Sequence, residues 1–238
     1  MSKVIPVSDQ NTRAMGVAMR PSEYTAALIQ VLRTRGARLR GAAVLEIGSG
    51  SGVVLAALAA LGAASLSGVD IEEEAIAEGS SLLQELGYAD IARIERGNMW
   101  APVAGRRFDL IAANLPHFPM HPVEFKGRLP SWSCGGSDGR HLLNPFLDGL
   151  AAHLAPGGHA VITHNAFVDL ELSRSMLRQH GLSLRIAQTC LVYISVEKLV
   201  LLTPSVLGTE EGQSIHRYGP HAFADMHIVE IGVAGTIA

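Results

Sequence analysis

Short apolar runs alternate with amphipathic stretches along the middle of the chain. Each run is short enough for one buried strand, and between the runs apolar residues recur at the spacing of a helix face. Strands separated by helices in this way pair in parallel, so the pattern predicts an α/β fold: a Rossmann-like, doubly wound, mainly parallel sheet with helices on both faces. The expected strands are 43–48, 65–70, 91–96, 108–114 and 158–164, and the expected helices are 52–62, 72–86, 139–154 and 168–180.

Both ends of the chain depart from this alternation. The first residues are polar and irregular, and a helix then opens at Pro21 and Ser22 and stops at Gly36. After Gly181 the chain becomes β-rich, with strands expected at 182–196 and 225–233. We expect one domain over residues 1–238, made of an N-terminal helical arm (1–40), a cofactor-binding core (41–181) and a C-terminal β segment (182–238).

Residues 202–224, between the last two expected strands, are rich in Gly, Pro, Ser and His. We interpret them as an insertion before the last strand. Long connections in compact domains are usually functional or disordered, and His216, Tyr218 and His221 could contact a planar substrate. We therefore expect this insertion to cover the substrate pocket.

A glycine-rich turn joins the first expected strand to the next helix. The apolar run before it ends in Gly48, Gly50 and Gly52, which are separated by serines. Glycine permits a left-handed backbone and lets a ligand approach without a Cβ in the way. The helix start behind the turn offers free N–H groups to a polar ligand end. Such a turn is weak evidence by itself, because many loops contain alternating glycines.

An acid at the end of the next expected strand strengthens the case. Asp70 closes the apolar run that begins at Leu66. The carboxyl ends of parallel strands meet at one edge of the sheet, where a carboxylate can bind the two hydroxyls of a ribose. The turn and Asp70 together predict a cofactor that contains a nucleoside.

The acid Glu46, two residues before the first glycine, favours a cationic cofactor. The turn also has one residue before its third glycine, where the dinucleotide fingerprint has two. A carboxylate here would repel a pyrophosphate but suits a ligand with a sulfonium and an ammonium group. The segment resembles motif I of the class I S-adenosylmethionine-dependent methyltransferases. That resemblance implies S-adenosylmethionine as cofactor, and a seven-stranded sheet whose last strand is antiparallel.

Asn98 and Met99 follow the third expected strand. The Asn98 side chain can accept a hydrogen bond from the exocyclic amine of adenine, and the next backbone N–H can serve a ring nitrogen. Family members usually have Asp at this place. The alternative is an ordinary turn in which Asn is favoured by its backbone tolerance. The cofactor set that we expect is Thr25, Glu46, Gly48, Ser49, Gly50, Gly52, Asp70, Ile71, Asn98, Met99 and Asn114.

The fourth expected strand leads into Asn114-Leu115-Pro116-His117. This loop resembles the catalytic N-P-P-Y loop of amino-group methyltransferases, including the glutamine methyltransferases that modify release factors. Segment 134–140 resembles the G-G-x-D-G segment of that family, and segment 20–25 resembles its P-R-P-x-T-E segment. The resemblance, over roughly residues 20–170, implies that Asn114 orients the nucleophile. Its side-chain carbonyl and a backbone carbonyl would accept both N–H bonds of a planar nitrogen group and direct the nitrogen at the methyl group.

Two residues of the loop depart from the family pattern. Leu115 replaces the first proline, and His117 replaces the aromatic residue. An imidazole can stack on a planar group, but it can also act as a base near neutral pH. That would permit an amine, a heteroaromatic nitrogen or a hydroxyl as acceptor. We expect His117 in the catalytic site beside Asn114, with a solvated loop histidine as the alternative.

The composition argues against some classes of binding partner. Nineteen Lys and Arg face 22 Asp and Glu, and the net charge of −3 argues against nucleic acid. Residues 1–13 lack the apolar core of a signal peptide, and the longest near-apolar run, 53–64, is too short to span a bilayer, so we expect no membrane partner. Cys134 and Cys190 form no Cys-x-x-Cys pair. We therefore expect no metal site and a cytoplasmic location.

The expected function is an S-adenosylmethionine-dependent methyltransferase that acts on a nitrogen of a small molecule. About forty residues precede the glycine turn, too few for the N-terminal domain with which the release-factor enzymes seat a protein substrate. Two alternatives stay open: methylation of a protein glutamine or of RNA, and a methyltransferase fold that binds a nucleoside without catalysis. The substrate, the choice of nitrogen or oxygen and the oligomeric state stay undetermined.

Overall fold

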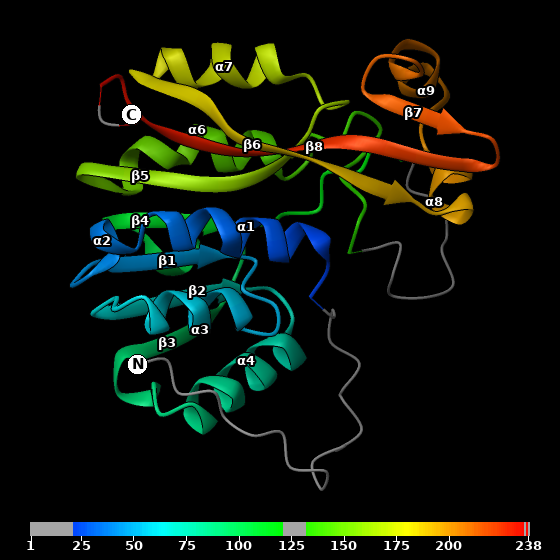
Figure 1. Cartoon of the computed structure of the whole chain (residues 1–238). Coiled ribbons are helices and arrows are strands. Elements are labelled where there is room, and N and C mark those ends of the chain that lie inside the picture. Colours follow the sequence, from blue (N-terminus) through cyan, green and yellow to red (C-terminus); the bar gives the residue numbers. More distant parts are fainter. Residues whose placement is uncertain (1–20, 121–131, 236, 238) are drawn as a thin grey trace, which may run out of the picture.

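The computed structural model describes residues 21–120, 132–235 and 237, and in these residues eight strands form one sheet (Figure 1). Seven strands follow the order β3-β2-β1-β4-β5-β8-β6, and β7 pairs with β8. Strands β1 to β5 run parallel, whereas β8 runs antiparallel to both β5 and β6. The Rossmann-like fold with an antiparallel last strand is confirmed. The strands are β1 (Ala43–Ile47), β2 (Ser65–Asp70), β3 (Ala92–Arg96), β4 (Phe108–Ala113), β5 (Leu154–Asn165), β6 (Leu182–Ile194), β7 (Ile215–Tyr218) and β8 (His221–Val233).

Helices cover both faces of the sheet. The chain steps from β1 toward β3 and then from β4 toward β5, in opposite directions along the sheet, so right-handed crossovers put the two sets of helices on opposite faces. On one face α3 contacts α1 and α4, and on the other face α6 packs on α7 (Figure 1). The helices are α1 (Glu23–Thr34), α2 (Gly36–Leu39), α3 (Val53–Ala60), α4 (Glu73–Glu85), α6 (Leu143–His153), α7 (Leu170–Gln179), α8 (Val196–Leu201) and α9 (Pro204–Glu210), with short 3-10 turns at Ala89–Ile91 and Ala101–Val103.

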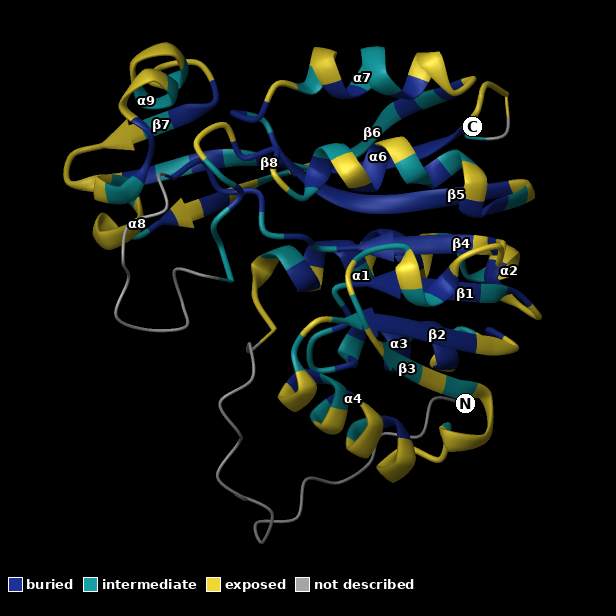
Figure 2. Ribbon diagram, turned by 180° about the vertical axis from the view of Figure 1, so that it is seen from behind, coloured by how far each residue is buried: buried dark blue, intermediate teal, exposed yellow. Residues whose placement is uncertain are grey.

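The central strands form the core (Figure 2). Nearly every residue of β1 and β4 is buried. Leu45 of β1 lies beside Ile111 of β4, and neither side chain is exposed. Burying each such side chain stabilises the fold by about 1.5–3 kcal/mol. Strands in a sheet that is covered on both faces must be apolar on both sides. The continuous apolar runs in the sequence therefore predicted these strands well.

Several element boundaries differ from the prediction. Gly36 does not end the helical region, because α1 ends at Thr34 and Gly36 begins the short helix α2. Strand β8 begins at His221 rather than at Asp225, because the residues before Asp225 pair with β7 and β6. The polar start of the chain, residues 1–20, lies outside the described residues. None of the helices in the described part is long and apolar enough to span a membrane.

Residues 196–218, here called the distal segment, comprise α8, α9 and β7. Strand β5 pairs with β8 only from Met226 onward, so β6 and the first half of β8 project past β5 and carry the distal segment at the right of Figure 1. Thr203 fastens it to the chain that follows β4. Its N–H donates to the Pro119 carbonyl at 3.0 Å, and its hydroxyl donates to the Ser137 carbonyl at 2.7 Å.

Candidate active site

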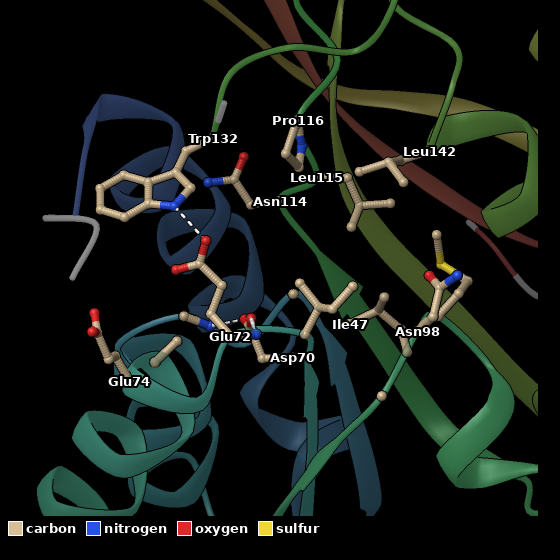
Figure 3. Close-up of a pocket in the computed structure, with 16 residues that line it drawn as sticks. Ile47, Asp70, Glu72, Glu74, Asn98, Asn114, Leu115, Pro116, Trp132 and Leu142 are labelled. Atoms are coloured by element: carbon tan, nitrogen blue, oxygen red, sulfur yellow. Dashed lines mark hydrogen bonds between the residues drawn. The ribbon is translucent and has the colours of Figure 1, made fainter. Parts of the chain in front are cut away.

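A pocket of about 290 Å³ lies at the carboxyl ends of the parallel strands (Figure 3). Doubly wound sheets bind their ligands at this edge, and the volume is near the lower end of small-molecule sites. The ends of β1, β2, β3 and β4 all contribute to it. The lining residues are Ile47, Gly48, Gly50, Asp70, Ile71, Glu72, Glu74, Ala75, Gly97, Asn98, Met99, Asn114, Leu115, Pro116, Trp132 and Leu142.

The glycine turn after β1 forms part of the pocket wall. Gly48 (φ 71°) and Gly50 (φ 48°) both line it in the left-handed backbone region. A Cβ on Gly50 would meet no protein atom within 4 Å, so the space beside this glycine is open to a ligand. Gly52 has another role: a Cβ there would lie 2.8 Å from the Cα of Gly79, so it permits close packing of α3 on α4. Gly52 does not line the pocket.

Asp70 ends β2 and lines the pocket as the sequence predicted. Its two carboxylate oxygens accept the backbone N–H groups of Gly50 at 2.8 Å and of Glu72 at 3.0 Å. These bonds tie the glycine turn to the start of α4 and hold the carboxylate in one orientation. Each oxygen keeps a second acceptor site, so the fixed carboxylate could still bind ribose hydroxyls.

Glu46 and Ser49 lie beneath the turn rather than in the pocket lining. Glu46 is 2% exposed, and its Oε2 has no hydrogen-bond partner, as is also true of the Ser49 hydroxyl. Burial raises the pKa of Glu46 well above its usual value, the nearby charge of Asp70 raises it further, and a bond from the Leu55 N–H opposes both. The site therefore contains an unsatisfied acidic group that a bound cation would stabilise.

Asn98, Met99 and Ile71 line the pocket on the side where an adenine would be expected. Met99 has φ 53°, the one positive value at a non-glycine residue in the described ranges. Such conformations cost energy and cluster at functional sites. Ile71 is 64% exposed although it is apolar, which suits a residue that covers a ligand.

Asn114 lies directly after β4, and its side-chain amide is fixed by two threonines. The Thr163 hydroxyl of β5 donates to Asn114 Oδ1 at 2.9 Å, and Asn114 Nδ2 faces the Thr25 hydroxyl at 3.5 Å. Thr25 is buried in α1, where it also accepts the N–H of Ser22, and it does not line the pocket. Thr25 thus acts on the site through Asn114. The side-chain amide of Asn114 lies between Trp132 and Pro116 in Figure 3.

His117 lies behind the loop and not in the pocket lining. It is 4% exposed, and both ring nitrogens are engaged: Nδ1 lies 2.5 Å from the Leu115 carbonyl, and Nε2 accepts the N–H of Asn165 at 2.9 Å. Burial lowers the pKa of His117 to about 4, against a smaller opposing effect of the Leu115 bond. This geometry disagrees with a histidine that removes a proton from a substrate.

The set of site residues predicted from the sequence omits several residues that line the pocket. Trp132 closes the pocket beside Asn114, and its Nε1–H donates to Glu72 at 2.9 Å. Glu72 lies directly before α4 and Glu74 lies in its first turn, and both line the pocket. In the described ranges, no group of three or more His, Cys, Asp or Glu side chains is arranged to hold a metal ion.

Comparison with known proteins agrees with this arrangement. Residues 44–126 match the methyltransferase domain family. The chain is 32% identical over 127 residues to the release factor glutamine methyltransferase of Gloeobacter violaceus, covering 50% of this chain and 44% of the relative. It is 30% identical over 148 residues to "Putative protein N5-glutamine methyltransferase MJ0928" of Methanocaldococcus jannaschii, covering 60% and 72%. The chain spans about half the length of the release-factor enzymes that it matches.

The fold is shared with solved methyltransferase structures. One is the E. cuniculi Mtq2–Trm112 complex responsible for methylation of the eRF1 translation termination factor, with a TM-score of 0.56, 15% identity and coverage of 91% of this chain and 98% of that chain. The sheet order, the pocket at the strand ends and these relatives define one class. The protein belongs to the class I S-adenosylmethionine-dependent methyltransferases, and it resembles the branch that contains the release-factor glutamine enzymes.

The expected small-molecule substrate is wrong. Several relatives that the chain matches are named for methylation of glutamine in release factors, in a protein and in ribosomal protein uL3. Residues 202–224 were separately expected to cover the substrate pocket. Of the lining residues that the structure describes, none comes from 202–224, so the evidence for a closed small-molecule site falls away.

Proposed function

We propose that this protein transfers a methyl group from S-adenosylmethionine to the side-chain amide nitrogen of a glutamine in a protein. The observation that carries the proposal is the position of Asn114: its fixed amide lines the same pocket as Asp70 and the open face of Gly50. A cofactor held by the turn would thus have the polar group of the N-L-P-H loop beside it. The named substrates of the relatives supply the class of acceptor.

The pocket chemistry fits S-adenosylmethionine. Gly50 leaves room for close approach, and the free carboxylate oxygen of Glu46 lies in a site that favours positive charge. Asp70 would hold the ribose, and Asn98 and Met99 would hold the adenine. When bound, the cofactor supplies an electrophilic methyl group on a sulfonium, which leaves as a neutral thioether.

The loop would then act on the acceptor amide. An amide nitrogen is a weak nucleophile because its lone pair is delocalised into the carbonyl. Asn114 Oδ1 and the Leu115 carbonyl would accept its two N–H bonds, shift electron density toward nitrogen and hold it in line with the methyl group. As the new N–C bond forms, the nitrogen loses one proton to solvent. Trp132 and Pro116 would enclose the planar amide.

The test is transfer of a labelled methyl group to purified release factor, with the product located by mass spectrometry. We expect one added methyl group on a glutamine, retained after the protein is digested. Free glutamine and small primary amides at equal concentration form the comparison, and we expect little transfer to them. Efficient methylation of these amides with none on the release factor would refute the protein substrate. Binding of S-adenosylhomocysteine without transfer to any acceptor would favour a fold that has lost catalysis.

A further inference from the structure

The N-L-P-H loop is held from behind by β5. Thr163, near the end of that strand, donates its hydroxyl to Asn114 Oδ1 at 2.9 Å. Asn165, its last residue, donates its N–H to His117 Nε2 at 2.9 Å, and His117 Nδ1 lies 2.5 Å from the Leu115 carbonyl. Both oxygens proposed to accept the substrate amide, on Asn114 and Leu115, are therefore bonded to groups that β5 positions.

The bonds of His117 define its tautomer. A backbone N–H can only donate, so Nε2 must be the unprotonated nitrogen that accepts from Asn165. Nδ1 then carries the ring proton and donates it to the Leu115 carbonyl. A charged imidazolium would have two donors and would lose the Asn165 bond. The neutral ring is consequently the form that fits this site.

The surroundings of His117 keep it neutral and fixed. Burial lowers its pKa to about 4, and the positive charge of Lys198 also lowers it. Two other titratable rings face it, Tyr24 at 6.2 Å edge-on and His164 at 6.4 Å between centroids. Burial raises the pKa of Tyr24 and lowers that of His164 to about 3, so both are uncharged near neutral pH.

The glycine segment after Trp132 clamps the same loop through its backbone. A Cβ on Gly135 would lie 2.6 Å from the Cα of His117, and a Cβ on Gly139 would lie 2.7 Å from the His117 carbonyl oxygen. Phe118 exchanges two backbone hydrogen bonds with this segment, to Ser133 and from Gly135, each at 2.9 Å. The loop therefore has little freedom to turn His117 toward the pocket.

We infer that His117 is a positioning residue, which as the neutral Nδ1–H tautomer fixes the Leu115 carbonyl, and with it the N-L-P-H loop beside the acceptor amide, and does not exchange protons with the substrate. The inference rests on the proposed transfer to an amide nitrogen. It explains how imidazole can replace the family's aromatic residue: the ring here supplies a hydrogen bond to the loop from behind, and the stacking surface comes from Trp132 instead.

The kinetic test compares three variants at saturating cofactor. His117→Phe removes both ring bonds, and we expect kcat to fall about 10- to 100-fold, as when a reacting group is displaced by about 1 Å, with the cofactor Kd within about twofold of wild type. His117→Asn keeps an N–H donor close to the Leu115 carbonyl and should recover part of the loss. His164→Phe is the matched control, because His164 is equally buried but bonds to Ser173 and to the Asn165 carbonyl instead of the loop. Its kcat should stay within about twofold once folding is verified.

Two measurements separate positioning from proton transfer. The wild-type pH–rate profile should have no limb near pH 6–7 that disappears in His117→Phe; such a limb would overturn the inference. Ring ¹⁵N shifts of the wild-type protein should show a protonated Nδ1 and an unprotonated Nε2 from about pH 5.5 to about pH 9. The opposite tautomer, or titration in that range, would also overturn it. The NMR result needs no substrate, so it decides the state of His117 even if release factor proves not to be the acceptor.

Discussion

The hydrogen bond from Thr163 to Asn114 offers a quantitative test of how the acceptor site is oriented. Thr163→Val keeps the shape of this buried side chain and removes the hydroxyl that donates to Asn114 Oδ1 at 2.9 Å. Thr163 does not line the pocket, so the substitution leaves its walls unchanged. Asn114 does line it, and water can replace the lost donor on Oδ1. The change should therefore act through the orientation of the amide.

The expected magnitude follows from that bond. A neutral hydrogen bond contributes about 1 kcal/mol net, which corresponds to roughly a fivefold decrease in kcat if the whole term is expressed in the transition state. Asn114→Ala removes the oriented group itself, and we expect a loss of about 100-fold. In the Asn114→Ala background, Thr163→Val should cause less than about a twofold further loss, because its partner is already gone.

The assay is the initial rate of labelled methyl transfer to release factor at saturating cofactor, with S-adenosylhomocysteine affinity measured by calorimetry. Both single variants should keep the cofactor Kd within about twofold of wild type. Thr25→Val is a useful comparison, because its hydroxyl lies 3.5 Å from Asn114 Nδ2, at the limit of a hydrogen bond, and should matter less. Equal fold losses for Thr163→Val in both backgrounds would refute the argument and indicate a general effect on folding.

Three further predictions concern the cofactor and the fold. Asp70→Ala should weaken S-adenosylhomocysteine binding by roughly 1.5–3 kcal/mol in calorimetry, while NAD binds neither protein; unchanged affinity would remove Asp70 from the site. Glu46→Gln should weaken S-adenosylmethionine binding yet make the ligand-free protein more stable at neutral pH. The pKa of Glu46 is raised in the folded protein, so the wild type loses stability as pH rises through that pKa, and the glutamine variant does not. Chemical denaturation at acid and neutral pH tests this. Glu230→Ala should lower stability by roughly 2 kcal/mol, between the values of exposed and buried ion pairs, since it leaves Arg35 and Arg185 without their shared partner. Burial raises the pKa of Glu230, but the bond from Arg35 and the positive charges of Arg35 and Arg185 lower it overall. The stability that Glu230 contributes should therefore be lost as pH falls through this lowered pKa. A wild-type denaturation series that shows no such loss would contradict the assignment.

The fold could be predicted from the sequence where burial alone decides. Strands covered on both faces need continuous apolar runs, and β1, β2 and β4 show them. Boundaries were harder, because pairing with distant chain sets them. Whether the final strand starts at His221 or at Asp225 depends on β6 and β7, and no local pattern records those contacts.

The site divides along the same line. Seven residues could be placed in the site because they lie at strand ends, and the structure brings all seven to one pocket: Gly48, Gly50, Asp70, Ile71, Asn98, Met99 and Asn114. Their roles in binding and catalysis, and the cytoplasmic location, stay predictions.

The direction of a side chain is not fixed by its position in a loop. His117 follows Asn114 closely but turns inward, because β5 and the glycines of 135–139 hold it there. The presence of Trp132 in the pocket lining depends on contacts between distant parts of the chain, which sequence spacing does not reveal.

The pairing of Ile194 with Ala222 has a consequence for engineering. These residues lie opposite each other on neighbouring antiparallel strands, so the chain between them leaves the sheet and returns to nearly the same point. A two-residue hairpin could close that gap without altering the register of β8 against β6 or β5. The distal segment can thus be tested as one unit: its replacement by a short turn would remove the bonds of Thr203 to the loop after β4 and leave the paired strands in place.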